Sequence, residues 1–221
     1  MNILALDAST YVGTVAVLRD GAVVASAEAA MRGARVERLM PTVAAMLAGG
    51  GSRRGGIDLV VCGAGPGSFT SLRIAASIAK GIAFGWSVPL HAVSSLALLV
   101  AGMEPLPGPG RYLAFLDALR GESYAQLVEV RDDATLVAPA GEPMLVASEA
   151  VAATARALDA IAVGPGGAID AMPHARGVAR LVGPTLVGQP VDLATWEPDY
   201  GRLAEAQVRW EAAHGRPLPQ G

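Results

Sequence analysis

The sequence of 221 residues holds one cysteine, Cys62, and only three histidines. One thiol cannot form an intramolecular disulfide, and His91, His174 and His214 do not follow a spacing of metal ligands. Gly, Pro, Arg or Lys interrupts every apolar run before it reaches the roughly 20 residues that a membrane span needs. These absences exclude a disulfide scaffold, a zinc cluster and a transmembrane protein.

Charge is scarce as well, since charged residues make up 17% of the chain and the formal net charge is −3. Such a chain offers no strongly basic surface that would bind nucleic acid by itself. The N-terminal stretch MNILALDAS has neither the basic region nor the cleavage pattern of a signal peptide, and it is typical of a strand. We therefore expect a cytoplasmic protein. The hydrophobic content of 52% is high for a soluble monomer and favours an interface with another chain.

Strands open the chain, and helices alternate with strands after them. Apolar runs around the turn signal Asp20-Gly21 predict the first strands, and apolar residues at helical spacing predict the helices. This order indicates an α/β fold with a mixed sheet. The predicted ranges are 2–7, 13–19 and 22–29 for the first strands, 35–48 for the first helix, 57–65 for the next strand and 70–86 for the second helix.

The sharpest change in composition is MEPLPGPG, residues 103–110, which we interpret as a boundary. We expect an N-terminal lobe of residues 1–105, a smaller second lobe of residues 106–190 and a helical tail of residues 191–221. The second lobe should begin with two strands about a tight turn at residues 117–121.

The stretch GAGPGSFT follows an apolar strand and precedes a helix, a position in which backbone N–H groups can face an anion. It lacks the Gly-Lys-Ser/Thr end of a P-loop and does not match G-x-G-x-x-G. The hydroxyl of Ser68 or Thr70 can equally cap the helix. A phosphate cradle and a capping loop are both open interpretations, and the loop consists of Gly65, Pro66, Gly67, Ser68 and Thr70.

The helix predicted at 70–86 is apolar on nearly all sides, so it must be covered on more than one side. One cover is its own sheet, and the other is a second helix of the chain or another protein. We expect a partner interface, with Arg73 as its orienting polar contact. The predicted interface residues are Val36, Leu39, Met40, Val43, Leu47, Arg73, Ala75, Ile78, Ala79 and Ile82.

Asp7 and Asp117 each end a predicted strand at a turn, where a site for a metal and a nucleotide would place carboxylates. Capping of the turn is the alternative for both. The glycine loop AVGPGGA at 162–168 follows another strand and is by itself a weak signal. No pair of nucleophile and base is evident, which argues against a peptidase.

Five stretches in this order resemble the TsaB (YeaZ) family: MNILALDAST, RVERLMP, GAGPGSFTSLRIAASIAKGIAFG, VPLHAVSSL and LDALRGESYAQL. The resemblance is close over residues 1 to about 130 and looser beyond. It implies an ASKHA (actin-like, RNase H-like) fold with two lobes of mixed sheets flanked by helices, the second lobe being reduced.

The resemblance also implies a role in transferring a threonylcarbamoyl group to N6 of an adenosine in tRNAs that read ANN codons. In that family the subunit is non-catalytic, pairs with the catalytic subunit TsaD, works with the ATPase TsaE and can form a homodimer. Contact with tRNA is expected only through the complex, and no cofactor, metal or membrane is expected.

Departures from the catalytic relatives agree with a non-catalytic role. Those relatives have a His-x-x-x-His metal motif where this chain has Ser95 and Leu99, neither of which holds a transition metal. The actin-like phosphate turn runs Asp-x-Gly-Thr, whereas this chain has Ser9 at the glycine position. At the second turn, Leu119 and Arg120 stand where small residues are expected. The alternative is an independent ATP-using enzyme of the same fold, which would need Asp7, Asp117 and the 162–168 loop.

Overall fold

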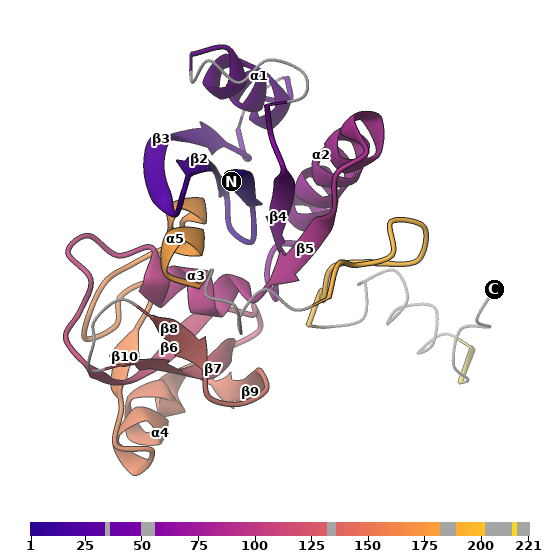
Figure 1. The fold of residues 1–221 in the computed structure, drawn as a ribbon. Helices are drawn as coiled ribbons and strands as arrows, with labels where there is room; N and C mark the ends of the chain where they lie inside the picture. The colour runs from indigo at the N-terminus through magenta and orange to yellow at the C-terminus, as the bar shows by residue number, and fades with distance from the viewer. Residues whose placement is uncertain (34–35, 50–55, 132–135, 182–188, 202–213, 216–221) are drawn as a thin grey trace.

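The computed structural model describes residues 1–33, 36–49, 56–131, 136–181, 189–201 and 214–215. Two β-sheets with helices packed on their faces make up this part of the chain (Figure 1). Within these ranges no helix combines the length and the apolar character that crossing a membrane requires. The predicted α/β class with mixed sheets is confirmed.

The first sheet has the strand order β3-β2-β1-β4-β5. β1 pairs antiparallel with β2 and parallel with β4, so it lies in the middle of a mixed sheet. β1 and β4 are almost wholly apolar and buried, because the sheet is covered on both faces. The strands are β1 (Asn2–Asp7), β2 (Val12–Arg19), β3 (Ala22–Ala30), β4 (Leu59–Gly63) and β5 (Leu90–Val93).

Two helices, α1 (Leu39–Gly49) and α2 (Phe69–Trp86), pack on the first sheet through one hydrophobic cluster. α1 contacts β2 and β3, whereas α2 contacts β1, β4 and β5. In Figure 1 both helices lie at the end of the molecule that is remote from the second sheet. The two helices therefore share one core and present their other sides to the outside.

The start of α1 differs from the predicted 35–48 range for a local reason. The carboxylate of Glu37 accepts hydrogen bonds from the backbone N–H groups of Leu39 and Met40, which satisfies two donors at the helix start. Pro41 then falls in the first turn, where its missing N–H would have no partner within the helix. The cap by Glu37 and the position of Pro41 thus explain why α1 begins at Leu39.

The second sheet has the order β10-β6-β7-β8, and β9 also pairs with β7. The central pair is the hairpin predicted about residues 117–121, while the two short strands after it were not predicted. A small apolar cluster packs α4 on this sheet. The elements are β6 (Gly110–Asp117), β7 (Glu122–Val130), β8 (Val137–Pro139), β9 (Met144–Ala147), the 3-10 turn η1 (Ser148–Ala150), α4 (Val151–Ala157) and β10 (Ile161–Val163).

α3 (Ser95–Ala101) lies between the sheets together with η2 (Ala175–Gly177) and α5 (Val178–Leu181) (Figure 1). All residues of α3 are buried, and one hydrophobic cluster contains residues of both sheets and of these helices. The sheets are therefore joined through a common core. The lobe boundaries at 105 and 190 stay a prediction, and the tail helix falls mainly on residues 202–213, outside the described residues.

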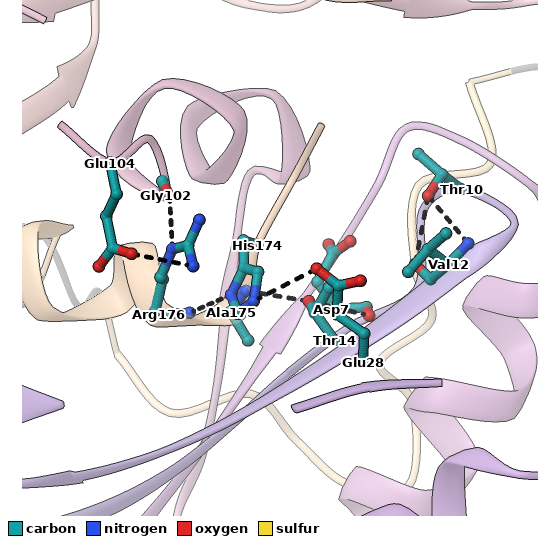
Figure 2. A network of polar contacts seen from close by, with 10 residues as sticks. All are labelled: Asp7, Thr10, Val12, Thr14, Glu28, Gly102, Glu104, His174, Ala175 and Arg176. Carbon is teal, nitrogen blue, oxygen red and sulfur yellow. Dashed lines mark hydrogen bonds and ion pairs between the residues drawn. The ribbon is translucent and has the colours of Figure 1, made fainter. Parts of the chain in front are cut away.

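Polar contacts tie η2 to β2 and to the end of α3 (Figure 2). The backbone N–H of Ala175 donates to Oγ1 of Thr14 at 2.9 Å, and that hydroxyl donates to the carbonyl oxygen of Asp7 at 3.4 Å. Nε of Arg176 donates to the carbonyl oxygen of Gly102 at 2.7 Å. A segment late in the chain is thus bonded directly to the strands that open it.

His174 begins this segment and is buried. Its Nδ1 accepts a hydrogen bond from the backbone N–H of Arg176 at 3.1 Å, and its Nε2 lies 3.9 Å from the Glu28 carboxylate. Burial, and next the positive charge of Arg176, lower the pKa of His174. Protonation of Nδ1 would break the cap of η2.

We predict that His174 makes the fold less stable as the pH falls. The unfolded chain takes up this proton near pH 6.5, and the folded chain only at lower pH. The contribution of His174 is therefore complete above about pH 6.5 and is lost as the pH falls through the folded pKa. His174→Asn keeps an acceptor for Arg176 but does not titrate. Between pH 7.5 and pH 5 the free energy of unfolding, measured in urea, should fall less for the His174→Asn variant than for the parent chain. The same pH dependence in both would show that His174 is not the group responsible.

Candidate functional site

Asp7 ends β1 with its carboxylate fully buried. Ser9 donates to Oδ1 from its backbone N–H at 3.0 Å and from Oγ at 2.8 Å. The hydroxyl of Ser95, at the start of α3, donates to Oδ2 at 2.5 Å. Burial raises the pKa of Asp7, and the hydrogen bonds from Ser95 and Ser9 oppose that rise only in part. Both carboxylate oxygens are therefore engaged inside the chain.

The glycines of the GAGPG loop bring the backbone against this carboxylate. A Cβ on Gly63 would lie 1.9 Å from Oδ2 of Asp7, and a Cβ on Gly67 would lie 2.2 Å from the carbonyl oxygen of Ser9. The N–H of Gly65 donates to Oγ of Ser95 at 3.0 Å. These glycines permit close packing of the loop on β1 and α3, and part of the N–H set that a phosphate cradle needs is already used.

Ser68 occupies the N-cap position of α2, but its hydroxyl does not cap the helix. Oγ donates to Oγ of Ser71 at 3.1 Å, while the Ser68 backbone N–H donates to the carbonyl oxygen of Ser9 at 2.7 Å. Thr70 lies in the first turn and is exposed. The prediction of a hydroxyl cap is wrong, because Ser68 is held against Ser9 with its side chain toward Ser71.

The two positions of the metal motif, Ser95 and Leu99, are fully buried in α3. Ser95 links Asp7 to the loop, and Leu99 packs in the core between the sheets. In the part of the chain that the structure describes, His, Cys, Asp and Glu side chains form no group of three or more that could hold a metal ion. α3 therefore contributes packing and one structural hydroxyl here.

The second carboxylate considered for a nucleotide site, Asp117, is exposed and caps its own turn. Its Oδ1 accepts a hydrogen bond from the N–H of Leu119 at 2.7 Å. In the 162–168 loop, a Cβ on Gly164 would lie 2.2 Å from the carbonyl oxygen of Phe115, and one on Gly167 would lie 2.8 Å from the Phe115 ring. A hydrogen bond within the turn thus accounts for Asp117, and packing on Phe115 accounts for the glycine loop.

Much of the predicted partner interface lies inside the chain. The side chains concerned form the cluster that packs α1 and α2 on the first sheet, so the prediction that they contact a partner is wrong. Residues covered by their own sheet cannot face another chain. These buried residues are Leu39, Val43, Leu47, Ala75, Ala79 and Ile82.

The remaining predicted interface residues have exposed surface. Val36 is 69% exposed and Met40 42% exposed, Arg73 is exposed, and Ile78 is half-buried. The apolar character of α2 thus reflects burial on the chain's own sheet for one side only. A partner role for these four residues stays a prediction.

Residues 189–201, here called the return segment, run back along β5 and α2. The N–H of Val191 donates to the carbonyl oxygen of Leu90 at 2.8 Å, and the N–H of Asp199 donates to that of Ala64 at 2.7 Å. The hydroxyl of Tyr124 donates to the carbonyl oxygen of Tyr200 at 3.1 Å. The sequence predicts a helical tail of residues 191–221, but the described part of it, residues 191–201, contains no helix. Backbone hydrogen bonds to residues distant in the sequence hold this part instead, and such contacts leave no local pattern in the sequence.

Arg73 is held by aromatic side chains of the chain itself. Its Nε donates to the hydroxyl of Tyr200 at 3.2 Å, and its guanidinium carbon lies 4.6 Å from the centre of the Phe69 ring. Farther along α2, the ammonium of Lys80 lies 5.7 Å from the ring of Trp196. Between α2 and the return segment is a groove of about 260 Å³.

We predict that Ser95→Ala lowers the free energy of unfolding by about 2 kcal/mol, because it leaves a buried carboxylate and a buried N–H each short of a partner. Urea unfolding at constant pH measures the loss. Ser26→Ala, at an exposed position of β3, is the matched control and should change the stability by less than about 0.5 kcal/mol. Equal effects of the two substitutions would show that the Asp7 bond is not important for folding.

We predict that Leu119→Asn raises the free energy of unfolding by about 1 kcal/mol. Leu119 has φ 63° and Arg120 has φ 58°, a left-handed conformation that leucine disfavours and asparagine tolerates. Leu145→Asn is the control, because Leu145 is an exposed leucine of β9 whose φ is not positive. Only Leu119→Asn should raise the midpoint of thermal unfolding. A rise for Leu145→Asn alone would show that the backbone at Leu119 is not strained.

Comparisons with known proteins match the chain to the TsaD family model and to proteins named TsaB or YeaZ. Residues 28–179 match the family model described as TsaD, tRNA N6-adenosine threonylcarbamoyltransferase. The chain is 39% identical over 124 residues to the Escherichia coli K12 protein named tRNA threonylcarbamoyladenosine biosynthesis protein TsaB. That alignment covers 56% of this chain and 53% of the relative, so it spans about half of the relative's length.

Two further matches extend over nearly the whole chain. A Bacillus subtilis 168 protein of the same name is 26% identical over 226 residues, covering 95% of this chain and 98% of the relative. The solved structure of YeaZ from Pseudomonas aeruginosa is 30% identical with a TM-score of 0.74, covering 89% of this chain and 98% of that one. Sequence, sheet topology and overall superposition together establish that the chain belongs to the TsaB (YeaZ) family and has its two-sheet ASKHA fold.

Proposed function

We propose that the chain is the non-catalytic partner subunit of the complex that transfers a threonylcarbamoyl group to N6 of an adenosine in tRNAs reading ANN codons. The observation that carries the proposal is the sealed carboxylate of Asp7, which accepts hydrogen bonds from Ser9 and Ser95 within the core. A metal–nucleotide site built on β1 would have to break these buried bonds, and Ser95 stands where the catalytic relatives are expected to have a metal ligand.

The proposed partners are a TsaD-type catalytic subunit and a TsaE-type ATPase, with tRNA reached through the complex in the cytoplasm. The names of the relatives from Escherichia coli and Bacillus subtilis support the pathway. The match to the TsaD family model supports the pairing, because two chains of related fold can pack through equivalent surfaces. A homodimer through the same surface is part of this proposal.

The alternative, an independent ATP-using enzyme, gains no support from the site. Its second carboxylate, Asp117, is exposed and bonded to its own turn. The glycines of its adenine loop, Gly164 and Gly167, pack against Phe115. These features have structural roles that need no nucleotide.

The surface that suits the partner is the outward side of α1 and α2, here called the outer face. Its residues are apolar or small, which allows close approach of another helix, and Phe84 is 79% exposed. Because both helices pack on the same sheet, their outward sides are presented together (Figure 1). The outer face consists of Met40, Pro41, Ala44, Ala45 and Ala48 on α1 and Ile74, Ile78, Gly81 and Phe84 on α2.

We predict that Met40→Glu and Ile78→Glu each weaken binding to the TsaD-type subunit at least about tenfold, because an interface core tolerates an unpaired charge poorly. Both variants should remain folded, since these side chains have exposed surface. Isothermal titration with the TsaD-type subunit measures the affinity, and circular dichroism checks the fold.

Two valine variants serve as controls for this experiment. Val24→Glu, on β3 and 46% exposed, should bind and fold as the parent does. Val43→Glu places the charge in the core beneath α1 and should unfold the chain. Normal partner affinity of both outer-face variants would refute the assignment of this surface, and normal threonylcarbamoyl transfer without this chain would refute the proposed function.

A further inference from the structure

The groove between α2 and the return segment contains two cations from one side of α2. Arg73 and Lys80 are seven residues apart, about two helical turns, so both point toward the return segment with roughly 10 Å between them along the helix axis. Trp196, Glu197 and Tyr200 line the groove from the other side. The groove thus has two cations on one wall and two aromatic side chains on the other, together with Glu197 and Pro198.

Aromatic rings hold both cations in place. The guanidinium carbon of Arg73 lies 4.6 Å from the centre of the Phe69 ring, and Nε donates to the hydroxyl of Tyr200. Among the described residues its two Nη groups form no hydrogen bond, so they can donate to another acceptor. The ammonium of Lys80 lies over Trp196. Within the described ranges neither cation forms an ion pair. A cation that rests on a ring is ordered without being neutralised.

The carboxylates nearby cancel these charges only in part. Glu197 lines the groove but forms no ion pair with Arg73 or Lys80 among the described residues. The carboxylates of Asp192 and Asp199 accept hydrogen bonds from backbone N–H groups of the return segment itself. The groove therefore keeps one excess positive charge on a chain whose net charge is −3.

We propose that this groove binds a phosphate group of the tRNA backbone through the Nη groups of Arg73 and the ammonium of Lys80, an inference that rests on the proposed function. A guanidinium edge can hold two phosphate oxygens at once, and the ammonium adds a point charge. The volume of about 260 Å³ is below that of pockets that enclose small ligands, so a polymer that passes across the surface fits better than a free nucleotide.

The test uses the complete complex of this chain with its TsaD-type and TsaE-type partners. Lys80→Gln should raise the Kd for unmodified tRNA roughly threefold to tenfold and the apparent KM for tRNA likewise, with kcat unchanged. Arg73→Gln should raise the Kd for tRNA by a similar factor. The slope of log K against log salt concentration should fall by about one for each cation removed. Arg156→Gln is the control, because it removes the same charge from α4 on the second sheet. Lys80→Arg keeps the positive charge and should bind tRNA as the parent does.

Unchanged Kd and salt slope in both variant complexes, with assembly normal by gel filtration, would overturn the phosphate groove while leaving the partner role intact. A loss of ATP affinity with unchanged tRNA affinity would show that the phosphate belongs to a free nucleotide, and a loss of partner binding alone would show that an acidic protein segment occupies the groove. Both results would overturn the inference. If the parent chain does not support threonylcarbamoyl transfer at all, the proposed function fails, and the inference fails with it.

Discussion

The hydrogen bond from Ser95 to the buried carboxylate of Asp7 connects the parts of the molecule on which the fold depends. It joins the end of β1 to the start of α3, and α3 fills the core between the two sheets. The same hydroxyl accepts the N–H of Gly65, which fixes the loop before α2. Because a buried carboxylate without donors would be costly, this one contact sets the positions of strand, loop and helix together.

The buried and hydrogen-bonded carboxylate of Asp7 also bears on where a ligand or partner can bind. A related fold that binds a nucleotide needs space and free hydrogen-bond donors at the end of its first strand. Here the backbone N–H of Ser68 donates to the carbonyl oxygen of Ser9 at 2.7 Å, and the carboxylate of Asp7 accepts its hydrogen bonds from within the chain. The two surfaces that we propose to be functional are on the outside of the molecule. The outer face of α1 and α2 is suited to a helical partner, and the groove beside the return segment offers the paired cations Arg73 and Lys80.

Both surfaces depend on how the chain covers α2. One side of the helix packs on the first sheet, and its flank is contacted by the return segment through Tyr200 and Trp196. Ile78 and Phe84 on α2 retain exposed surface beside these two covers. The return segment thus limits the apolar surface that a partner has to bury, and it orders the cations at the border of that surface.

The sequence by itself determined the fold class, the hairpin at 117–121 and the family, because strands, helices and motif glycines leave local patterns in composition and spacing. It also indicated that α2 is covered on more than one side. Only the tertiary structure decided which surface covers each side of the helix. Val43 and Ala79 are apolar at helical spacing, as Met40 and Ile78 are, but packing on the first sheet buries the first pair completely. Periodicity reports which residues avoid water and not which surface covers them, so the division between core and partner face had to come from the packing of α1 and α2 on the first sheet.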